Sequence, residues 1–307
     1  MRLVTYVSDN SPHLGVVRGT AVLDVARLGQ LTGGTELPDS MLGLFDAGPI
    51  ALTRLKEALA VQTNDALREA GGAWPLSETT LLAPIPRPRK NIFCLGKNYA
   101  EHARESNRAR GESDVAPEAP LFFTKAPTSV IGPDAPILIH PLSDQVDWEI
   151  ELAVVIGRRG RNLRAAEAMD FVFGYTILND VSARDVQWRH GRQFFKGKSL
   201  DGTCPLGPWI VTADEIPNVH GLTLRLWVNG VLKQEGHTTD LIYDIPTIIA
   251  ALAEGMTLEA GDIIATGTPG GVGFARQPPE FLRPGDVVEQ EIEGIGRMRN
   301  PVALAES

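Results

Sequence analysis

Alternating apolar and polar residues near the N-terminus predict a small unit of strands followed by helices. The alternation covers residues 2–7 and 14–18, and a third apolar segment, residues 20–28, continues from a strand into a helix. Residues 50–70 are mostly good helix formers with apolar positions near helical spacing, and the Gly-Gly pair that follows should end this helix. We expect a small α/β unit of about 80 residues, with a lean core for an independent domain.

A proline-rich segment, residues 84–90, predicts a connector after this unit. It divides the chain into a small N-terminal domain, residues 1–83, and a larger domain, residues 84–307. Beyond the connector, residues 91–96 are typical of a buried strand, and residues 97–110 of a polar helix.

The remainder of the chain is dense in short strands. Residues 222–234 alternate on both sides of an Asn-Gly pair, which predicts a type I′ hairpin, and further strands are expected within 261–267 and 285–302. Residues 241–255 predict a helix with a glycine stop, and residues 111–119 a mobile loop. Because strands predominate and do not alternate with helices, we expect a strand-rich α+β fold, and a parallel Rossmann-type sheet is disfavoured.

Composition and charge exclude several classes of protein. The chain has 307 residues, of which 43% are hydrophobic and 22% charged, as in ordinary soluble globular proteins. It has no apolar stretch of about 18 residues for a transmembrane helix, and its N-terminus has no apolar signal-peptide region. The net charge of −9 argues against general nucleic-acid binding. Cys94 and Cys204 have no CxxC spacing, which favours reduced thiols in a cytoplasmic protein.

Three carboxylates occupy strand-like apolar surroundings. Glu149 and Glu151 are two residues apart and therefore share one face of a strand, while Asp180 ends a second apolar segment. Clustered carboxylates repel one another and lose solvation, so they require a cation or shared protons. A hard divalent ion with oxygen ligands is the simplest solution. The wet face of an edge strand is the open alternative, although residues 152–156 indicate burial on both faces.

His102 and Glu105 form an HxxE pair in the polar helix. The spacing of three places both side chains on one helix face, where the carboxylate orients the imidazole as a general base for water. An incidental pair on a solvated helix is the alternative. The sequence has no HExxH motif and no second histidine at zinc spacing, which argues against a zinc protease.

Further polar residues follow the carboxylates in the sequence. Lys198 is a candidate counter-ion or oxyanion stabiliser. Arg184 and Gln187 follow Asp180 at offsets of four and seven, so a helical turn would place them beside it. A local ion pair between Arg184 and Asp185 is the alternative.

The glycine-rich segment 266–273 lacks the Lys-Ser/Thr of a P-loop, and we interpret it as a tight turn that brings Thr268 to a ligand. The remaining histidines are expected at the surface, with His190 the least certain of them. Four tryptophans are expected in the core rather than around a cofactor: Trp148, Trp188, Trp209 and Trp227.

Over about residues 90–303 the chain resembles the fumarylacetoacetate hydrolase family. The resemblance rests on the ordered motifs LGKNYAEHARE, FFTKAPTSVIGP, DWEIELAVVIG, GYTILNDVSARDVQ, KSLDGTCPLGPWIV and DIIATGTPGGVG. It implies a catalytic domain with a mixed β-sandwich roll, usually a homodimer, that binds Mg²⁺ or Mn²⁺, with Ca²⁺ as a further candidate. Residues 1–83 resemble the variable front domain of bacterial members.

The resemblance also assigns roles to residues. It implies metal ligands at Glu149, Glu151 and Asp180, and catalytic groups at His102, Glu105 and Lys198. It places four residues around the substrate: Arg184, Gln187, Thr268 and Tyr99. One departure is Asn98, where the animal fumarylacetoacetate enzyme has an acidic metal ligand. This departure favours the acylpyruvase-like bacterial branch.

These assignments together predict a metal-dependent hydrolase. It would cleave a C–C bond of a 2,4-dioxo acid of the acylpyruvate or fumarylpyruvate type, through an enolate held at the metal and water activated by His102 and Glu105. Decarboxylation of oxaloacetate-like acids and isomerisation of hydroxymuconate or hydroxyheptadienedioate acids need the same site and stay open. A catalytically silent binding protein would lack a ligand or a dyad residue. A small keto acid is the expected partner, with no nucleic acid or membrane.

Overall fold

The computed structural model describes residues 1–33, 36–113, 117–191 and 193–306. The first ten strands are β1 (Arg2–Ser8), β2 (Ser11–Arg18), β3 (Ala21–Asp24), β4 (Ala73–Pro75), β5 (Leu81–Leu82), β6 (Ile92–Gly96), β7 (Leu121–Lys125), β8 (Val130–Ile131), β9 (Ile137–Ile139) and β10 (Val146–Asp147). The remaining strands are β11 (Ile150–Ile156), β12 (Val172–Asn179), β13 (Ser182–Ala183), β14 (Cys204–Thr212), β15 (Thr223–Val228), β16 (Val231–His237), β17 (Ile263–Ala265), β18 (Val287–Ile292) and β19 (Gly296–Leu304). The α-helices are α1 (Val25–Leu31), α2 (Met41–Val61), α3 (Asn64–Glu69), α4 (Ala100–Arg110), α5 (Ala165–Ala168), α6 (Arg184–Arg189), α7 (Phe194–Lys198) and α8 (Ile245–Ala253).

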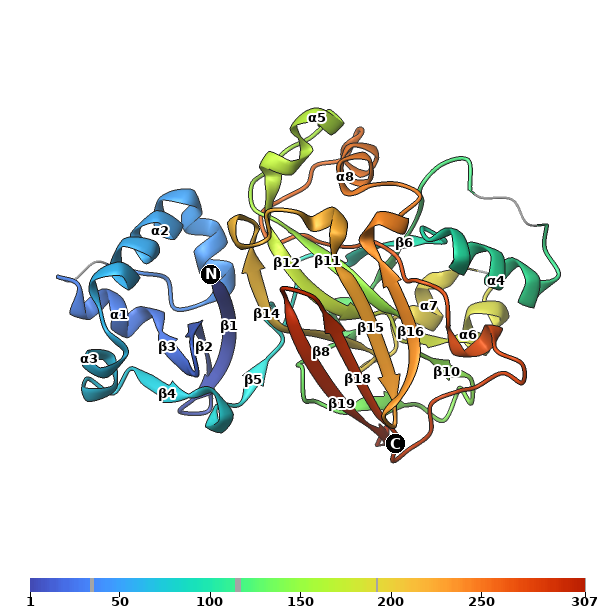
Figure 1. Ribbon diagram of the computed structural model, residues 1–307, viewed down its shortest axis with the longest axis horizontal. Helices are drawn as coiled ribbons and strands as arrows, with labels where there is room; N and C mark the ends of the chain where they lie inside the picture. Colours follow the sequence, from blue (N-terminus) through green and yellow to red (C-terminus); the bar gives the residue numbers. More distant parts are fainter. Residues whose placement is uncertain (34–35, 114–116, 192, 307) are drawn as a thin grey trace.

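Most of these strands belong to two sheets. The larger sheet has the order β4-β3-β2-β1-β14-β12-β11-β17-β6-β7, with β5 paired to β1 and β8 paired to β14, and the smaller has the order β16-β15-β18-β19-β9. Strands β10 and β13 form a separate pair. Most pairs are antiparallel, and β14–β8, β17–β6 and β19–β9 are parallel. The expected strand-rich mixed α+β fold is therefore confirmed (Figure 1).

The N-terminal elements lie together at one end of the molecule (Figure 1). Strand β1 pairs with β14, with Leu3 opposite Ile210, so the large sheet continues from this unit into the rest of the chain. One apolar cluster includes Leu28 and Leu55 of the N-terminal unit together with Ala153 of β11, which explains how a lean unit is stabilised. We propose a boundary at residues 83–84, where the proline-rich segment begins.

Two helix predictions need correction. The single helix expected over 50–70 is divided between α2 and α3, because Thr63 accepts a hydrogen bond from the amide of Ala66 at 3.1 Å and starts a new helix. Helix α2 begins earlier than expected and is interrupted at Gly48, which has a φ of 69°. The helix expected over 241–255 begins only at Ile245, after Asp244 caps the amide of Thr247.

Other expectations are confirmed. The Asn-Gly pair between β15 and β16 has positive φ at both residues, 52° and 76°, as a type I′ turn requires. Both cysteines are buried free thiols. Of the loop expected at 111–119, residues 114–116 lie outside the described residues.

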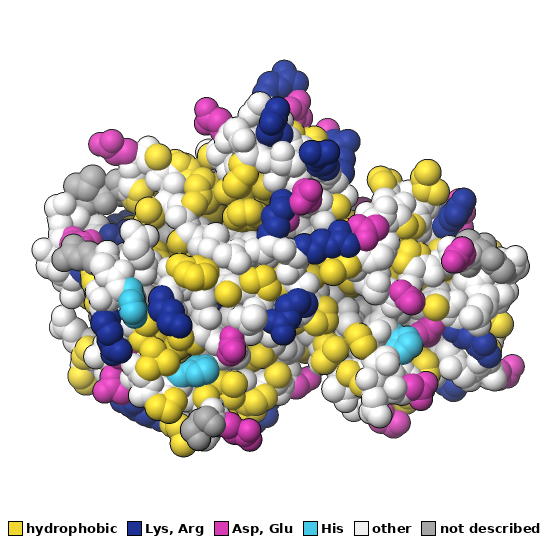
Figure 2. Space-filling view, turned by 180° about the vertical axis from the view of Figure 1, so that it is seen from behind, with side chains coloured by type: hydrophobic (Ala, Val, Ile, Leu, Met, Phe, Trp, Pro, Cys, Tyr) yellow, Lys and Arg dark blue, Asp and Glu magenta, His cyan; other side chains and the backbone are white. Residues whose placement is uncertain are grey.

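Basic and acidic side chains are interspersed on the face shown in Figure 2. No helix within the described residues is long and apolar enough to cross a membrane. The core assignment of the tryptophans holds for Trp148, which is 1% exposed, but is wrong for Trp188, which is 37% exposed. The guanidinium of Arg110 lies 4.7 Å from the ring centroid of Trp188, near the outer end of α4.

Strand β11 is buried along its whole length, as residues 152–156 predicted. Its alternate residues Leu152 and Val154 pack into one apolar cluster, and Ala153 and Val155 pack into another. Glu151 shares the face of Ala153 and Val155. The strand therefore carries a carboxylate into the interior, and the edge-strand alternative is excluded.

Candidate active site

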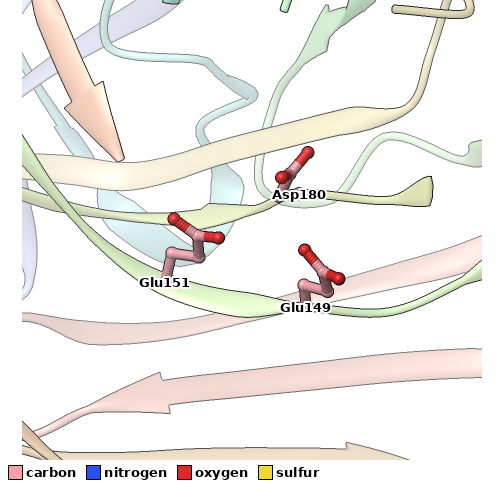
Figure 3. Close-up of side chains that lie close together, drawn as sticks. All are labelled: Glu149, Glu151 and Asp180. Carbon is pink, nitrogen blue, oxygen red and sulfur yellow. The ribbon is translucent and has the colours of Figure 1, made fainter. Parts of the chain in front are cut away.

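The three predicted carboxylates meet at one place. Glu149 immediately precedes β11, Glu151 lies on it, and Asp180 immediately follows the neighbouring strand β12. One oxygen from each residue lies within 4.8 Å of the others, and all three side chains are buried. Figure 3 shows both glutamates pointing from one strand toward Asp180.

Two hydrogen bonds link the strand ends that carry this cluster. The amide of Asp180 donates to the carbonyl of Glu149 at 2.9 Å. The amide of Glu149 donates in turn to the side-chain oxygen of Asn179 at 3.0 Å. The two strand ends are thus joined at the positions that carry the carboxylates.

Two of the carboxylates have buried cationic partners. Lys198 Nζ lies 2.6 Å from both Glu149 Oε2 and Asp180 Oδ2, and Arg184 Nη2 lies 2.5 Å from Glu149 Oε1. Lys125 Nζ lies 3.0 Å from Asp180 Oδ1. Burial alone would raise the pKa of Glu149, but Arg184 and Lys198 outweigh it and hold this pKa well below its usual range.

Glu151 has a different environment. Its Oε2 accepts a hydrogen bond from the amide of Gly267 at 2.7 Å, and no lysine or arginine in the described ranges forms an ion pair with it. Burial, together with the charges of Asp180 and Glu149, raises the pKa of Glu151 well above its ordinary value. A buried carboxylate without a counter-ion is unfavourable, so a proton or a metal ion must neutralise it.

The donor set fits a divalent metal ion. Glu149, Glu151 and Asp180 offer only carboxylate oxygens, which are the ligands that Mg²⁺ and Mn²⁺ prefer. Glu151 forms no ion pair with a lysine or arginine of the described residues, so a bound cation would neutralise its carboxylate. These residues therefore are able to bind a divalent metal ion.

The predicted dyad is formed on α4. His102 Nδ1 lies 3.1 Å from Glu105 Oε1, and the Glu105 carboxylate also accepts hydrogen bonds from the amides of Gly271, at 2.9 and 3.1 Å, and Val272, at 3.4 Å. A carboxylate that already accepts these bonds favours the His102 tautomer with its proton on Nδ1. Nε2 is then the basic atom, so the ring has the form that a general base needs.

Residues of the carboxylate cluster and of the dyad line the same cavity. The cavity is small, with a volume of about 370 Å³ when its open mouth is included. Its lining includes seven of the ten predicted site residues: His102, Glu149, Glu151, Arg184, Gln187, Lys198 and Thr268. Asp180 contacts Lys198 from behind, and Glu105 contacts His102.

Tyr99, like Asp180 and Glu105, is absent from the described cavity lining. It is 2% exposed, and its hydroxyl has no hydrogen-bond partner among the described residues. Its role in binding substrate stays a prediction. Thr268 accepts a hydrogen bond from Gln234 at 2.8 Å, which fixes its hydroxyl at the cavity.

The geometry expected for Arg184 was wrong. A helical turn from Asp180 does not form, because β13 intervenes and α6 begins only at Arg184. Arg184 instead contacts Glu149 and Asp147, and its Nη1 lies 3.5 Å from Gln187 Oε1. Asp185 accepts a hydrogen bond from Ser143, so the local pair with Arg184 does not form either.

Sequence reasoning missed two charged residues behind the site. Asp147 continues the spacing of two before Glu149 and Glu151, and that spacing was a usable signal. Lys125 is fully buried at the end of β7 and donates to the carbonyls of Val181 and Lys198. No local pattern predicts a lysine buried in this way.

Comparison with known proteins identifies the family. Residues 91–303 match the family model described as fumarylacetoacetate (FAA) hydrolase C-terminal. The chain is 46% identical to oxaloacetate tautomerase YisK of Bacillus subtilis (strain 168) over 269 residues, 87% of each protein.

Solved structures agree over nearly the whole chain. A fumarylacetoacetate hydrolase from Exiguobacterium antarcticum is 40% identical with a TM-score of 0.81, covering 99% of this chain and 100% of that one. Maleylpyruvate hydrolase from Sphingobium sp. SYK-6, in complex with manganese (II) ion and pyruvate, is 33% identical with a TM-score of 0.72, and 100% of both chains is covered. The protein therefore belongs to the fumarylacetoacetate hydrolase family.

Proposed function

We propose that the protein is a divalent-metal-dependent tautomerase of a small 2-keto dicarboxylic acid of the oxaloacetate type. The observation that carries the proposal is that Glu149 and Glu151 of the carboxylate cluster line one small cavity together with His102 of the dyad. The similarity to an oxaloacetate tautomerase supports this reaction over the C–C hydrolysis expected from the sequence. Keto–enol interconversion needs a base beside a group that stabilises negative charge, and both are present.

Glu149, Glu151 and Asp180 would hold Mg²⁺ or Mn²⁺. The bound ion would act as a Lewis acid toward the oxygens of the keto acid. Arg184 and Lys198 keep Glu149 ionised, because both cations are buried against its carboxylate, and Lys198 also orients Asp180.

His102 moves the proton. Its Nε2 takes a proton from C3 of the substrate, the C–H electron pair forms the C2–C3 double bond, and the C2=O π pair moves onto the oxygen. Protonated His102 then returns the proton to that oxygen and is regenerated as the base. Glu105 holds the ring and stabilises its protonated form, through the contact of 3.1 Å between His102 Nδ1 and Glu105 Oε1.

The direct test follows the enol form of oxaloacetate by its ultraviolet absorbance. We expect the wild-type protein with Mn²⁺ to accelerate the conversion to the keto form, and Glu149→Ala to lose this acceleration while remaining folded. An acceleration by Glu149→Ala equal to that of wild type would contradict the proposal.

A second candidate is hydrolysis of a 2,4-dioxo acid such as an acylpyruvate. The observation that favours it is the same dyad, since a base oriented by a carboxylate also activates water. The similarity to a maleylpyruvate hydrolase adds support. Mass spectrometry separates the candidates, because hydrolysis adds water and yields two acids, decarboxylation releases CO₂, and tautomerisation changes no mass.

A further inference from the structure

Four consecutive backbone amides in the turn before residue 275 serve two different carboxylates. Gly271 and Val272 donate to Glu105 of the dyad. The next two amides donate to Asp147: Gly273 N lies 2.7 Å from Oδ1, and Phe274 N lies 3.1 Å from Oδ2. The turn 271–274 therefore joins Glu105 to Asp147 through main chain alone.

Asp147 also reaches the carboxylate cluster. Its Oδ2 accepts hydrogen bonds from Arg184 Nε at 3.0 Å and Nη2 at 2.8 Å. The same Nη2 donates to Glu149 Oε1 at 2.5 Å. Asp147 is fully buried and is absent from the described cavity lining, so it acts on the site only through these partners.

The turn packs closely against neighbouring backbone at two of its glycines. Gly271 has a φ of +102°, and a Cβ there would lie 2.2 Å from the carbonyl oxygen of Lys233. A Cβ at Gly273 would lie 2.2 Å from the carbonyl oxygen of Glu280 and 2.6 Å from Asp147 Oδ1. A displacement of Asp147 must therefore move the turn as a unit or break its bonds.

We propose that Asp147 is a positioning residue that sets both halves of the site at once. Through Arg184 it fixes the Glu149 carboxylate, and through the turn 271–274 it fixes Glu105 and hence the ring of His102. Five donors converge on its two oxygens, counting the amide of Trp148 at 2.8 Å. A neutral side chain of the same shape cannot accept all of them.

The variant Asp147→Asn isolates this role. Its amide nitrogen would face N–H donors on one side, either those of Arg184 or those of the turn. Substitution of a residue that hydrogen-bonds to metal ligands or their partners typically lowers metal affinity or activity by about 10–100-fold. We therefore expect losses of this size in both Mn²⁺ affinity and kcat. KM should change less, since Asp147 does not line the cavity.

Three readouts test the proposal. Calorimetry with Mn²⁺ alone measures the metal affinity of the carboxylate cluster. NMR spectra of ¹⁵N-histidine-labelled protein report the tautomer of His102, whose signals are assigned by their absence in His102→Gln. The effect of Asp147→Asn on kcat is also measured with Glu105→Gln as background, where we expect it to shrink because both changes act on the same ring. Asp170→Asn is the matched control, since its side chain is 75% exposed.

The proposal is supported if Asp147→Asn weakens Mn²⁺ binding and shifts the His102 signals while Asp170→Asn does neither. A change in only one of these two readouts, or in neither, overturns it. If Asp147→Asn does not fold, Asp147→Ser is measured in its place, and the same outcomes decide. The kcat readout rests on the proposed function, whereas the other two need no substrate. A wild-type protein inactive on oxaloacetate therefore refutes the proposed function without deciding the role of Asp147.

Discussion

The two halves of the site are built in opposite ways. The carboxylate cluster sits at the joined ends of β11 and β12, with Glu149, Glu151 and Asp180 all at most 4% exposed. The dyad sits on α4, and the side chain of Glu105 is 22% exposed. Side-chain cations hold the cluster, whereas Glu105 is held by the amides of the turn 271–274.

This difference corresponds to two tasks. A set of metal ligands must hold several carboxylate oxygens at fixed distances from one another. The paired strands fix the backbone of these residues, and the buried cations orient Glu149 and Asp180. A proton-transferring base must direct its basic nitrogen toward the substrate, which the hydrogen bonds from the turn to Glu105 and from Glu105 to His102 achieve. The account therefore predicts that a substitution within one half leaves the measured property of the other half intact, whereas a substitution of Asp147, which contacts both halves, changes both properties.

The largest combined effect, on metal binding and turnover together, should come from Glu151, the proposed ligand that has no lysine or arginine partner among the described residues. Glu151→Gln keeps the shape but removes the charge that favours a metal ion. We expect Mn²⁺ binding to be lost and turnover to fall on the order of 10³-fold, since Lewis-acid stabilisation amounts to several kcal/mol. Calorimetry and the enol assay measure these effects. Glu69→Gln, at an exposed position on α3, is the control, and equal Mn²⁺ affinity in the two variants would exclude Glu151 as a ligand.

A smaller effect is expected from the partner of the base. Glu105→Gln keeps an oxygen for the backbone amides of the turn but removes the charge that stabilises protonated His102. Turnover should fall about 10–100-fold while Mn²⁺ affinity stays that of wild type. Loss of Mn²⁺ affinity in this variant would show that the halves are not separable.

The smallest effect concerns stability without metal. The folded state binds a proton at Glu151 more tightly than the unfolded chain does, because the pKa of Glu151 is raised above its ordinary value of 4.5. Unfolding then releases this proton, so Glu151 lowers the free energy of unfolding as pH rises above that value.

In chelator-treated protein, Glu151→Gln should therefore have the higher Tm at neutral pH, by a few degrees, and the difference should shrink toward pH 4.5. Scanning calorimetry between these limits measures it. Parallel curves of Tm against pH for the two proteins would contradict the assigned environment of Glu151.

The extent to which each half was predictable follows from how local its signal is. A spacing of two predicted that Glu149 and Glu151 share one strand face, and a spacing of three predicted that His102 and Glu105 share one helix face. Both predictions were possible because strand and helix periodicity act over neighbouring residues. The contact between Arg184 and Asp147 was not predictable, because the two residues lie 37 positions apart and meet only when β10 pairs with β13. Lys125 lies 73 residues from Lys198 and meets it only in the folded protein.

The fold shows the same division between local and distant interactions. The type I′ hairpin and the buried strand β11 were predicted from short patterns. The joining of β1 to β14 was not, because strands separated by most of the chain carry no mutual signal in one sequence. The break between α2 and α3 had a local signal in Thr63, which helix propensity over a long window obscured.

The central claim is that the carboxylates hold the metal ion and His102 moves the proton. The most direct measurement pairs Mn²⁺ calorimetry with the enol-to-keto rate of oxaloacetate in His102→Gln, using His190→Gln as the control because His190 is exposed. The account predicts that His102→Gln keeps the Mn²⁺ affinity of wild type and lowers the rate on the order of 10²–10⁴-fold. The control His190→Gln should keep both the affinity and the rate of wild type. A wild-type rate in His102→Gln, or a loss of Mn²⁺ binding with the rate, would contradict it.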